Sequence, residues 1–245
     1  MKRLSIAIQL ILAFALVFSL LFFFVNGQDL HWENVWEYRY LFLKGWWVTI
    51  ILSAASLVLS LVIGIVIALL RRSNVALLSF LARIYVELIR GTPLLVQILF
   101  FYYVVAHNIG LENRYLAGIL VLSIFSGAYI AEMIRSGIEN ISATQLESAK
   151  AIGLTTTQSY RFVIFPQALR QVIPPLAGQF ASIIKDSSLL SVIGINELTN
   201  TAQQVNSATY STLESFFPLA VGYLILTLPI SLWSKYLERK FQYET

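Results

Sequence analysis

The chain has 245 residues, a mean hydropathy of +0.74 and 12% charged residues, about half the charged share of soluble proteins. This composition excludes an ordinary soluble domain and predicts an all-α protein that crosses the membrane several times. The net charge of +4 comes from basic residues at the ends of apolar runs, so no nucleic-acid partner is expected. The chain has no cysteine and its two histidines are far apart, so neither a disulfide nor a metal site is expected.

Six apolar segments are predicted to cross the membrane as helices, at residues 4–25, 46–70, 84–106, 115–134, 174–195 and 216–233. The first follows Lys2 and Arg3 and would be about 33 Å long, so it is expected to be a retained span and not a cleaved signal peptide. The third joins a short apolar run to residues upstream of Gly91-Thr92-Pro93, which predicts a broken helix.

The basic residues predict how these segments are oriented. With the N-terminus inside, most lysines and arginines fall on the cytoplasmic side, whereas Arg39, Lys44 and Arg114 fall outside. Both termini are therefore expected in the cytoplasm. Small residues recur every four positions in the second and fourth spans, which predicts close helix packing there; they are Ser56, Ser60, Gly64 and Ala68, and Ser123, Gly127 and Ala131.

Residues 137–173 form a polar, proline-containing connection in an otherwise apolar chain. Thr144 followed by Glu147 is typical of a capping box and predicts a helix that ends near Gly153 in a left-handed turn. The threonines at 155–157 offer a second N-cap, and Pro166 is expected to bend or restart the chain. Such a rigid connection is suited to docking on a partner, although a solvated loop without any partner fits the same pattern.

The order of motifs in this chain resembles a known family. Glu147-Ser148-Ala149, Gly153 and Val163-Ile164-Phe165-Pro166 together resemble the EAA signature of binding-protein-dependent ABC importer permeases. Ser148 stands where that signature has alanine, and Val163 and Phe165 where it has isoleucine and leucine. Further segments resemble the polar amino-acid branch of the family (histidine, glutamate, glutamine, arginine or opine permeases); they begin at Lys44, Glu87, Ala128, Pro166 and Lys185.

The resemblance implies a type I permease core of five transmembrane helices at residues 44–240. Residues 1–43 would then add an N-terminal transmembrane helix and an outer interfacial segment, and residues 241–245 a cytoplasmic tail. The resemblance also implies that a coupling helix in the loop 137–173 docks on an ATPase subunit. The residues implied in this contact are Glu147, Ser148, Ala149, Ile152, Gly153 and Pro166.

The chain carries no phosphate-binding loop and no catalytic constellation, so it is expected to be neither an enzyme nor a cofactor-binding protein. The resemblance places ATP and Mg²⁺ on a separate ATPase dimer at the cytoplasmic face. It also implies a second permease chain, identical or not, and a periplasmic or extracellular amino-acid-binding protein. The expected location is the bacterial inner membrane.

A solute path needs polar residues at membrane depth, where they usually face a cavity or a partner. The candidates on the fifth span are Gln179, Ser182, Lys185 and Asp186, and those on the fourth are Ser126 and Tyr129. A lysine and an aspartate complement the carboxylate and ammonium of an amino acid. The alternative is that they are structural ion partners, for example Lys185 with Glu132, or partners across the dimer axis.

The function expected from these features is ATP-driven import of a polar amino acid by alternating access. Two other classes fit a polytopic chain with a partner-binding loop. A secondary transporter driven by an ion gradient would show inverted repeats, which are not visible in this sequence. A membrane signalling or scaffold protein would bind its partner through the loop without moving any solute.

Overall fold

The computed structural model describes residues 30–242, and within this range the regular structure is entirely helical. The span predicted at 4–25 and residues 243–245 lie outside the described residues. The described helices are α2 (Trp32–Trp36), α3 (Arg39–Arg71), α4 (Ala76–Arg90), α5 (Leu94–Phe100), η1 (Phe101–Ala106), α6 (Arg114–Glu139), α7 (Ala143–Ala151), α8 (Thr156–Ser159), η2 (Tyr160–Ile164), α9 (Phe165–Asp186), η3 (Ser187–Ile193), α10 (Leu198–Thr209) and α11 (Thr212–Gln242).

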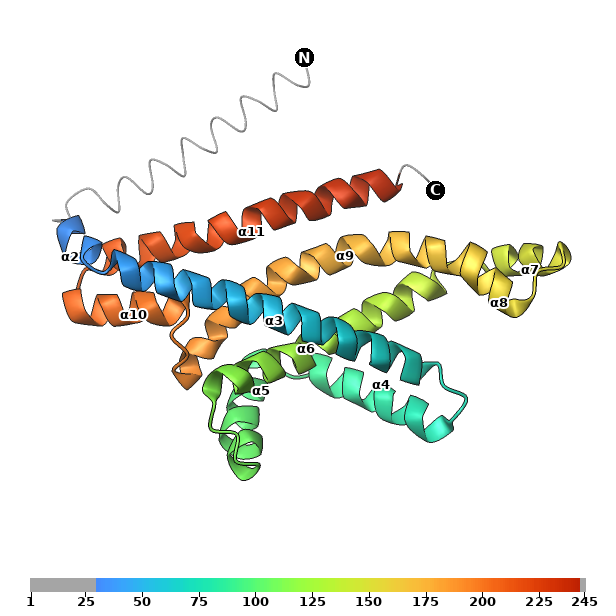
Figure 1. Cartoon of the computed structure of the whole chain (residues 1–245), viewed down its shortest axis with the longest axis horizontal. Helices are drawn as coiled ribbons and strands as arrows, with labels where there is room; N and C mark the ends of the chain where they lie inside the picture. Colours follow the sequence, from blue (N-terminus) through green and yellow to red (C-terminus); the bar gives the residue numbers. More distant parts are fainter. Residues whose placement is uncertain (1–29, 243–245) are drawn as a thin grey trace, which may run out of the picture.

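The long helices lie lengthwise and define two ends of the molecule. Figure 1 shows α3, α9 and α11 running along the long axis, with α2 and α10 at one end and α7 and α8 at the other. We call the second end the loop end, because it carries the connection between α6 and α9. The helix α3 packs on α6, and α9 packs on both α6 and α11.

Three described helices, α3, α6 and α11, are long and apolar enough to cross a membrane. They contain the predicted spans 46–70, 115–134 and 216–233, which confirms those three predictions. The predicted third span is a bent pair, since the chain bends by 108° between Ala76–Arg90 and Leu94–Ala106. The break falls at Gly91-Thr92-Pro93, as expected where a proline without an N–H restricts the residue before it. By length and composition, the described chain therefore has up to four spans.

The fifth predicted span, 174–195, is not among the described helices that are long and apolar enough to cross a membrane, and its bounds also differ in the structure. The helix α9 begins at Phe165 and ends at Asp186, and the chain continues as the 3-10 helix η3. Pro174 and Pro175 were expected to open this helix but lie inside it. The neighbouring helix α11 supports this proline-containing segment, because the Ser234 hydroxyl donates a hydrogen bond to the carbonyl oxygen of Pro174 at 3.0 Å.

The close packing predicted from the small residues is confirmed where α3 crosses α6. A Cβ added at Gly64 would lie 2.5 Å from Cγ2 of Ile130, and one added at Gly127 would lie 2.6 Å from Cγ2 of Ile63. The two helices therefore approach closely enough that only glycine fits at these positions. The serines of the same rows, Ser56, Ser60 and Ser123, are fully buried. This contact holds α6 in place, and α6 leads directly into the loop end.

Candidate functional site

The predicted helix in the polar loop is present as α7, Ala143–Ala151, but its N-cap differs from the prediction. The cap is Ser142, whose hydroxyl accepts a hydrogen bond from the backbone N–H of Thr144. Thr144 is thus inside the first turn, and the capping box expected between Thr144 and Glu147 does not form. Ser142, two residues before Thr144, already accepts a hydrogen bond from an otherwise unpaired N–H of the first turn. Thr144 is therefore not needed as the N-cap.

The turn after α7 follows the prediction. Gly153 has a φ of +84°, the left-handed conformation that glycine adopts at low cost. The second predicted N-cap is also present at Thr155, which forms a reciprocal capping box with Gln158 at the start of α8. These two features fix the angle between α7 and α8 and make the loop a defined structure.

Pro166 does not restart the chain as expected. The short helix α8 continues through the π-helical turn η2 into α9, and Pro166 lies in the first turn of α9. A π turn bonds each N–H one residue further back than an α turn, and such single turns occur within α-helices, where they can kink the axis. The loop therefore joins α9 as one continuous helical segment.

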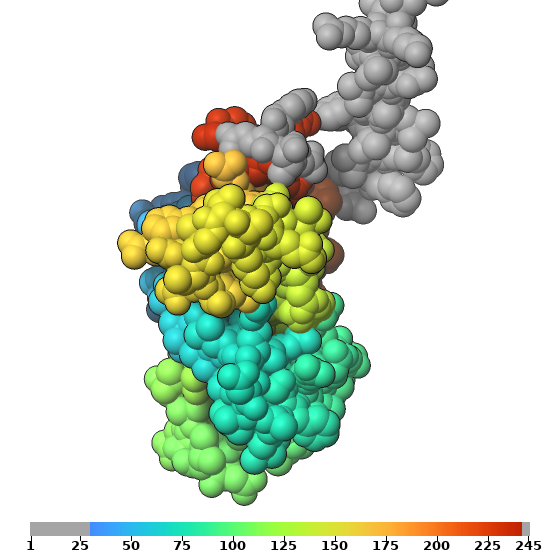
Figure 2. Space-filling view, turned by 90° about the vertical axis from the view of Figure 1, so that its right-hand side faces the viewer, coloured from blue at the N-terminus to red at the C-terminus, as the bar shows by residue number. Residues whose placement is uncertain are grey.

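The residues of α7 and its C-cap, Ile152, differ in how exposed they are. Ala149 is 3% exposed and faces the rest of the loop, whereas Glu147 and Ser148 are exposed and Ile152 is 77% exposed. Phe162 and Phe165, further along the loop, are each 62% exposed. Figure 2 views the molecule from this end, and the loop stands in front of the other helices. Large apolar side chains are thus left uncovered on a polar connection.

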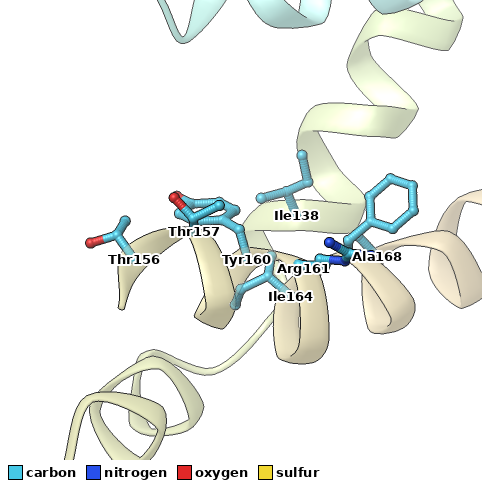
Figure 3. A pocket seen from close by; sticks show the side chains of 8 residues that line it. Ile138, Thr156, Thr157, Tyr160, Arg161, Ile164 and Ala168 are labelled. Atoms are coloured by element: carbon cyan, nitrogen blue, oxygen red, sulfur yellow. The ribbon is translucent and has the colours of Figure 1, made fainter. Parts of the chain in front are cut away.

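Two hollows flank this surface. The first, of about 340 Å³, lies between α7 and η2 and includes Ser148, Ala149 and Ile152 in its walls. The second, of about 510 Å³, lies between the end of α6 and the segment α8–η2–α9. Figure 3 shows Ile138 of α6 next to Tyr160 and Ile164 in this second hollow. Both hollows are open, and their walls are mainly apolar.

Four of the predicted path residues lie on α9. Gln179 is 7% exposed, and the Ser182 hydroxyl donates to the carbonyl oxygen of Gly178. Lys185 is exposed and Asp186 is half-buried. The prediction placed these last two residues midway along the fifth span, but they are the final residues of α9, next to η3. The charges therefore lie away from the loop end, at the opposite end of α9.

The two predicted path residues of α6 have different surroundings. Ser126 is fully buried and its hydroxyl has no hydrogen-bond partner. The Tyr129 ring lies 5.0 Å from the Phe125 ring and 5.5 Å from the Arg90 guanidinium, measured to ring centroids. Tyr129 thus contacts α4 through a cation–π interaction.

Glu132 of α6 is the centre of a cluster of charges near the loop end. Its carboxylate contacts Arg71 of α3 at 2.7 Å, Arg90 of α4 at 3.5 Å and Arg135 of its own helix at 2.6 Å. Arg135 also pairs with Glu139. The predicted alternative of a Lys185–Glu132 pair is not found, because Lys185 lies at the end of α9 away from the loop end and Glu132 pairs with these three arginines. The cluster joins the cytoplasmic ends predicted for three helices.

Glu197, a fully buried carboxyl at the start of α10, is not among the residues predicted from the sequence. It accepts hydrogen bonds from the backbone N–H groups of Thr199 and Asn200, at 2.7 and 2.8 Å, and from the Tyr223 hydroxyl of α11, at 2.9 Å. Burial raises the pKa of this carboxyl, and these hydrogen bonds oppose the rise. An acidic residue directly before a helix was the available signal, but α10 itself was not predicted.

Comparisons with known proteins agree with this architecture. Residues 60–243 match the model of the family described as binding-protein-dependent transport system inner membrane component. The probable glutamine ABC transporter permease protein GlnM of Bacillus subtilis is 37% identical over 203 residues, covering 82% of this chain and 94% of that protein. The nopaline transport system permease protein NocM of Agrobacterium fabrum is 38% identical over 193 residues, covering 75% of this chain and 80% of that protein.

A solved structure also matches. It is a crystal structure of an amino acid ABC transporter with histidines, which has a TM-score of 0.81 and 34% sequence identity. The match covers 87% of this chain and 100% of that one.

Proposed function

Because the chain belongs to the family of binding-protein-dependent transport system inner membrane components, we propose that it is the permease subunit of an importer driven by a separate ATPase. The chain is a multi-pass membrane protein of the amino-acid ABC transporter permease type. The relatives named above carry glutamine or nopaline, so a polar amino acid is the proposed cargo of this chain as well.

The observation that supports ATPase coupling is the exposed apolar surface of the loop end. Ile152 is 77% exposed beside the charged residues Glu147 and Lys150, in a polar connection where water and not lipid would otherwise surround it. Exposed apolar surface costs roughly 25 cal/mol per Å² relative to burial. A partner that covers Ile152 therefore gains free energy, and we infer that this partner is the ATPase subunit.

Differences in exposure around α7 suggest how the contact is made. Ala149 is buried, whereas Glu147, Ser148 and Ile152 are exposed. We infer that these exposed side chains enter a cleft on the ATPase. Gly153 and Pro166 act indirectly, since they set the turn after α7 and the entry into α9. ATP and Mg²⁺ bind to the ATPase, and this chain contributes no group to hydrolysis.

The solute path is proposed along α9. Lys185 is an exposed charge on a helix that packs between two membrane-spanning helices, α6 and α11. A charge facing lipid is costly, so Lys185 is expected to face an aqueous path or a second permease chain. Asp186 and Ser182 follow on the same helix, and an amino acid carries the complementary carboxylate and ammonium. Gln179, Ser126 and Tyr129 are more enclosed and would line the path only after a change in helix packing.

The working cycle follows from these assignments. A binding protein outside the membrane delivers the amino acid to a pair of permease chains, with both termini of this chain in the cytoplasm. Closure of the ATPase dimer on ATP draws the two α7 helices together and turns the path outward. Hydrolysis reverses the movement and releases the solute inside, which is alternating access.

Reconstitution tests this proposal. The purified chain, its ATPase and its binding protein are placed in proteoliposomes, and uptake of radiolabelled glutamine and other polar amino acids is measured with and without ATP. We expect uptake only with ATP and all components. Uptake by the chain alone under an ion gradient would instead identify a secondary transporter.

The loop contact is tested with Ile152→Asp. Burial of an isoleucine is worth about 1.5–3 kcal/mol, so the variant should bind the ATPase about 10- to 150-fold more weakly. Val75→Asp is the matched control, because Val75 is 55% exposed at the N-cap of α4, where aspartate is favourable. Equal ATPase affinity in the two variants would contradict the docking role of α7.

A further inference from the structure

Two adjacent arginines at the end of α3 contact two different parts of the molecule. Arg71 is the last residue of α3, and its guanidinium donates to the Glu132 carboxylate of α6 at 2.7 Å. Arg72 is the C-cap, and its guanidinium donates to the Tyr160 hydroxyl of η2 at 2.8 Å. The same guanidinium lies 5.8 Å from the centroid of the Tyr160 ring. The end of α3 therefore bridges the helix that enters the loop and the one that leaves it.

Tyr160 lies in the part of the loop that α7 contacts directly. The helix α7 packs against α8 and η2, so a displacement of α7 is passed first to these two short helices. Gln167 of α9 also donates a hydrogen bond to Gln145 of α7, which connects α7 to α9. Tyr160 is the first residue of η2, and through Arg72 it connects the same loop to α3.

The two contacts differ in how firmly they are held. The Arg71 and Glu132 side chains are 13% and 22% exposed, and Glu132 is also held by Arg90 and Arg135. Arg72 is exposed and Tyr160 is 39% exposed, so water competes for their single hydrogen bond. The first contact is an anchor within the charge cluster. The second is weak enough to break and reform during a conformational cycle.

We propose that Arg71 and Arg72 together form a positioning link that makes the loop-end tips of α3 and α6 follow the displacement of α7. In this link the contact between Arg72 and Tyr160 breaks and re-forms, whereas the contact between Arg71 and Glu132 stays in place. The inference rests on the proposed function, because the displacement comes from the ATPase. It adds a second route into the membrane helices, beside the direct continuation of the loop into α9.

The test uses the complete complex in proteoliposomes, with Arg72→Ala, Tyr160→Phe and the double variant. Uptake and ATP hydrolysis are measured in the same vesicles, together with complex assembly and thermal stability. Loss of one net hydrogen bond of about 0.5–1.5 kcal/mol corresponds to a factor of about 2 to 12. We expect the number of solutes moved per ATP to fall by this factor in each single variant, while the complex still assembles. Arg83→Ala, which removes an exposed arginine from α4, should keep the ratio of the unaltered chain.

The double variant separates a link from two independent effects. If the arginine and the tyrosine act through each other, the double variant should match the single variants and not multiply their losses. An unchanged ratio in both single variants overturns the proposal. Loss of assembly in both, or an equal fall in uptake and hydrolysis, identifies a structural brace and also overturns it. If the unaltered complex shows no ATP-dependent uptake, the proposed function fails and not this link alone.

Discussion

Replacing Gly64 with alanine tests how closely α3 and α6 approach each other. The added Cβ would lie 2.5 Å from Cγ2 of Ile130, 2.7 Å from its Cβ and 3.2 Å from the carbonyl oxygen of Gly127. Carbon atoms in contact are normally about 3.5–4.0 Å apart, so α6 has to move. Two of these three atoms are a Cβ and a backbone oxygen, which no rotamer change displaces. The cost should therefore lie near about 3 kcal/mol, the upper part of the range for overpacking.

Alanine itself is favoured over glycine inside a helix by about 1 kcal/mol, which leaves a net loss of about 2 kcal/mol. For a chain of this length, that loss lowers the Tm by about 4–8 °C. The assay is thermal unfolding of the purified protein in detergent, followed by tryptophan fluorescence. Gly178→Ala is the control, because the nearest atom to its new Cβ is the Ser234 hydroxyl oxygen at 3.6 Å. A Gly64→Ala chain as stable as the control would refute the close crossing of α3 and α6.

Three further substitutions address the loop, the solute path and the start of α10. Gly153→Val forces a β-branched residue to a φ of +84° and should cost about 1–3 kcal/mol and weaken ATPase association, whereas Gly153→Asn should be tolerated; a pull-down with the ATPase measures both. Asp186→Asn should change the uptake KM or rate while the complex still assembles, and loss of the complex would favour a structural role. Glu197→Gln replaces one accepting oxygen with an NH2 group that faces a backbone N–H donor, and it should cost about 1–3 kcal/mol in thermal unfolding. An unchanged Tm would contradict the hydrogen bonds described for Glu197.

Features that depend on local chemistry were predictable from the sequence. The three long apolar helices, the break at Gly91-Thr92-Pro93 and the left-handed Gly153 each follow from a few neighbouring residues. The glycine rows also correctly predicted close packing between α3 and α6, because small side chains at four-residue spacing share one helix face.

Features that depend on distant partners were not predictable in the same way. Pro174 was expected to open a helix, but α11 supports it inside α9. Glu132 was considered as a partner of Lys185, but folding brings the arginines of α3 and α4 to it. The buried hydrogen bonds of Glu197 were not predicted, because its partner Tyr223 approaches only through the packing of α10 against α11. The roles of the candidate path residues stay predictions, because they depend on the second permease chain that we propose.

The long helices differ sharply in how much protein surrounds them. In its most apolar window, α6 is 56% buried, whereas α11 is 11% buried. The apolar helix Thr212–Phe241 has 30 residues and is therefore about 45 Å long, more than the roughly 30 Å of a hydrocarbon core. Such a helix has to tilt or protrude. Because α11 packs mainly on α9 and α10, these two helices should set its inclination, and a thinner bilayer should lengthen the part that protrudes.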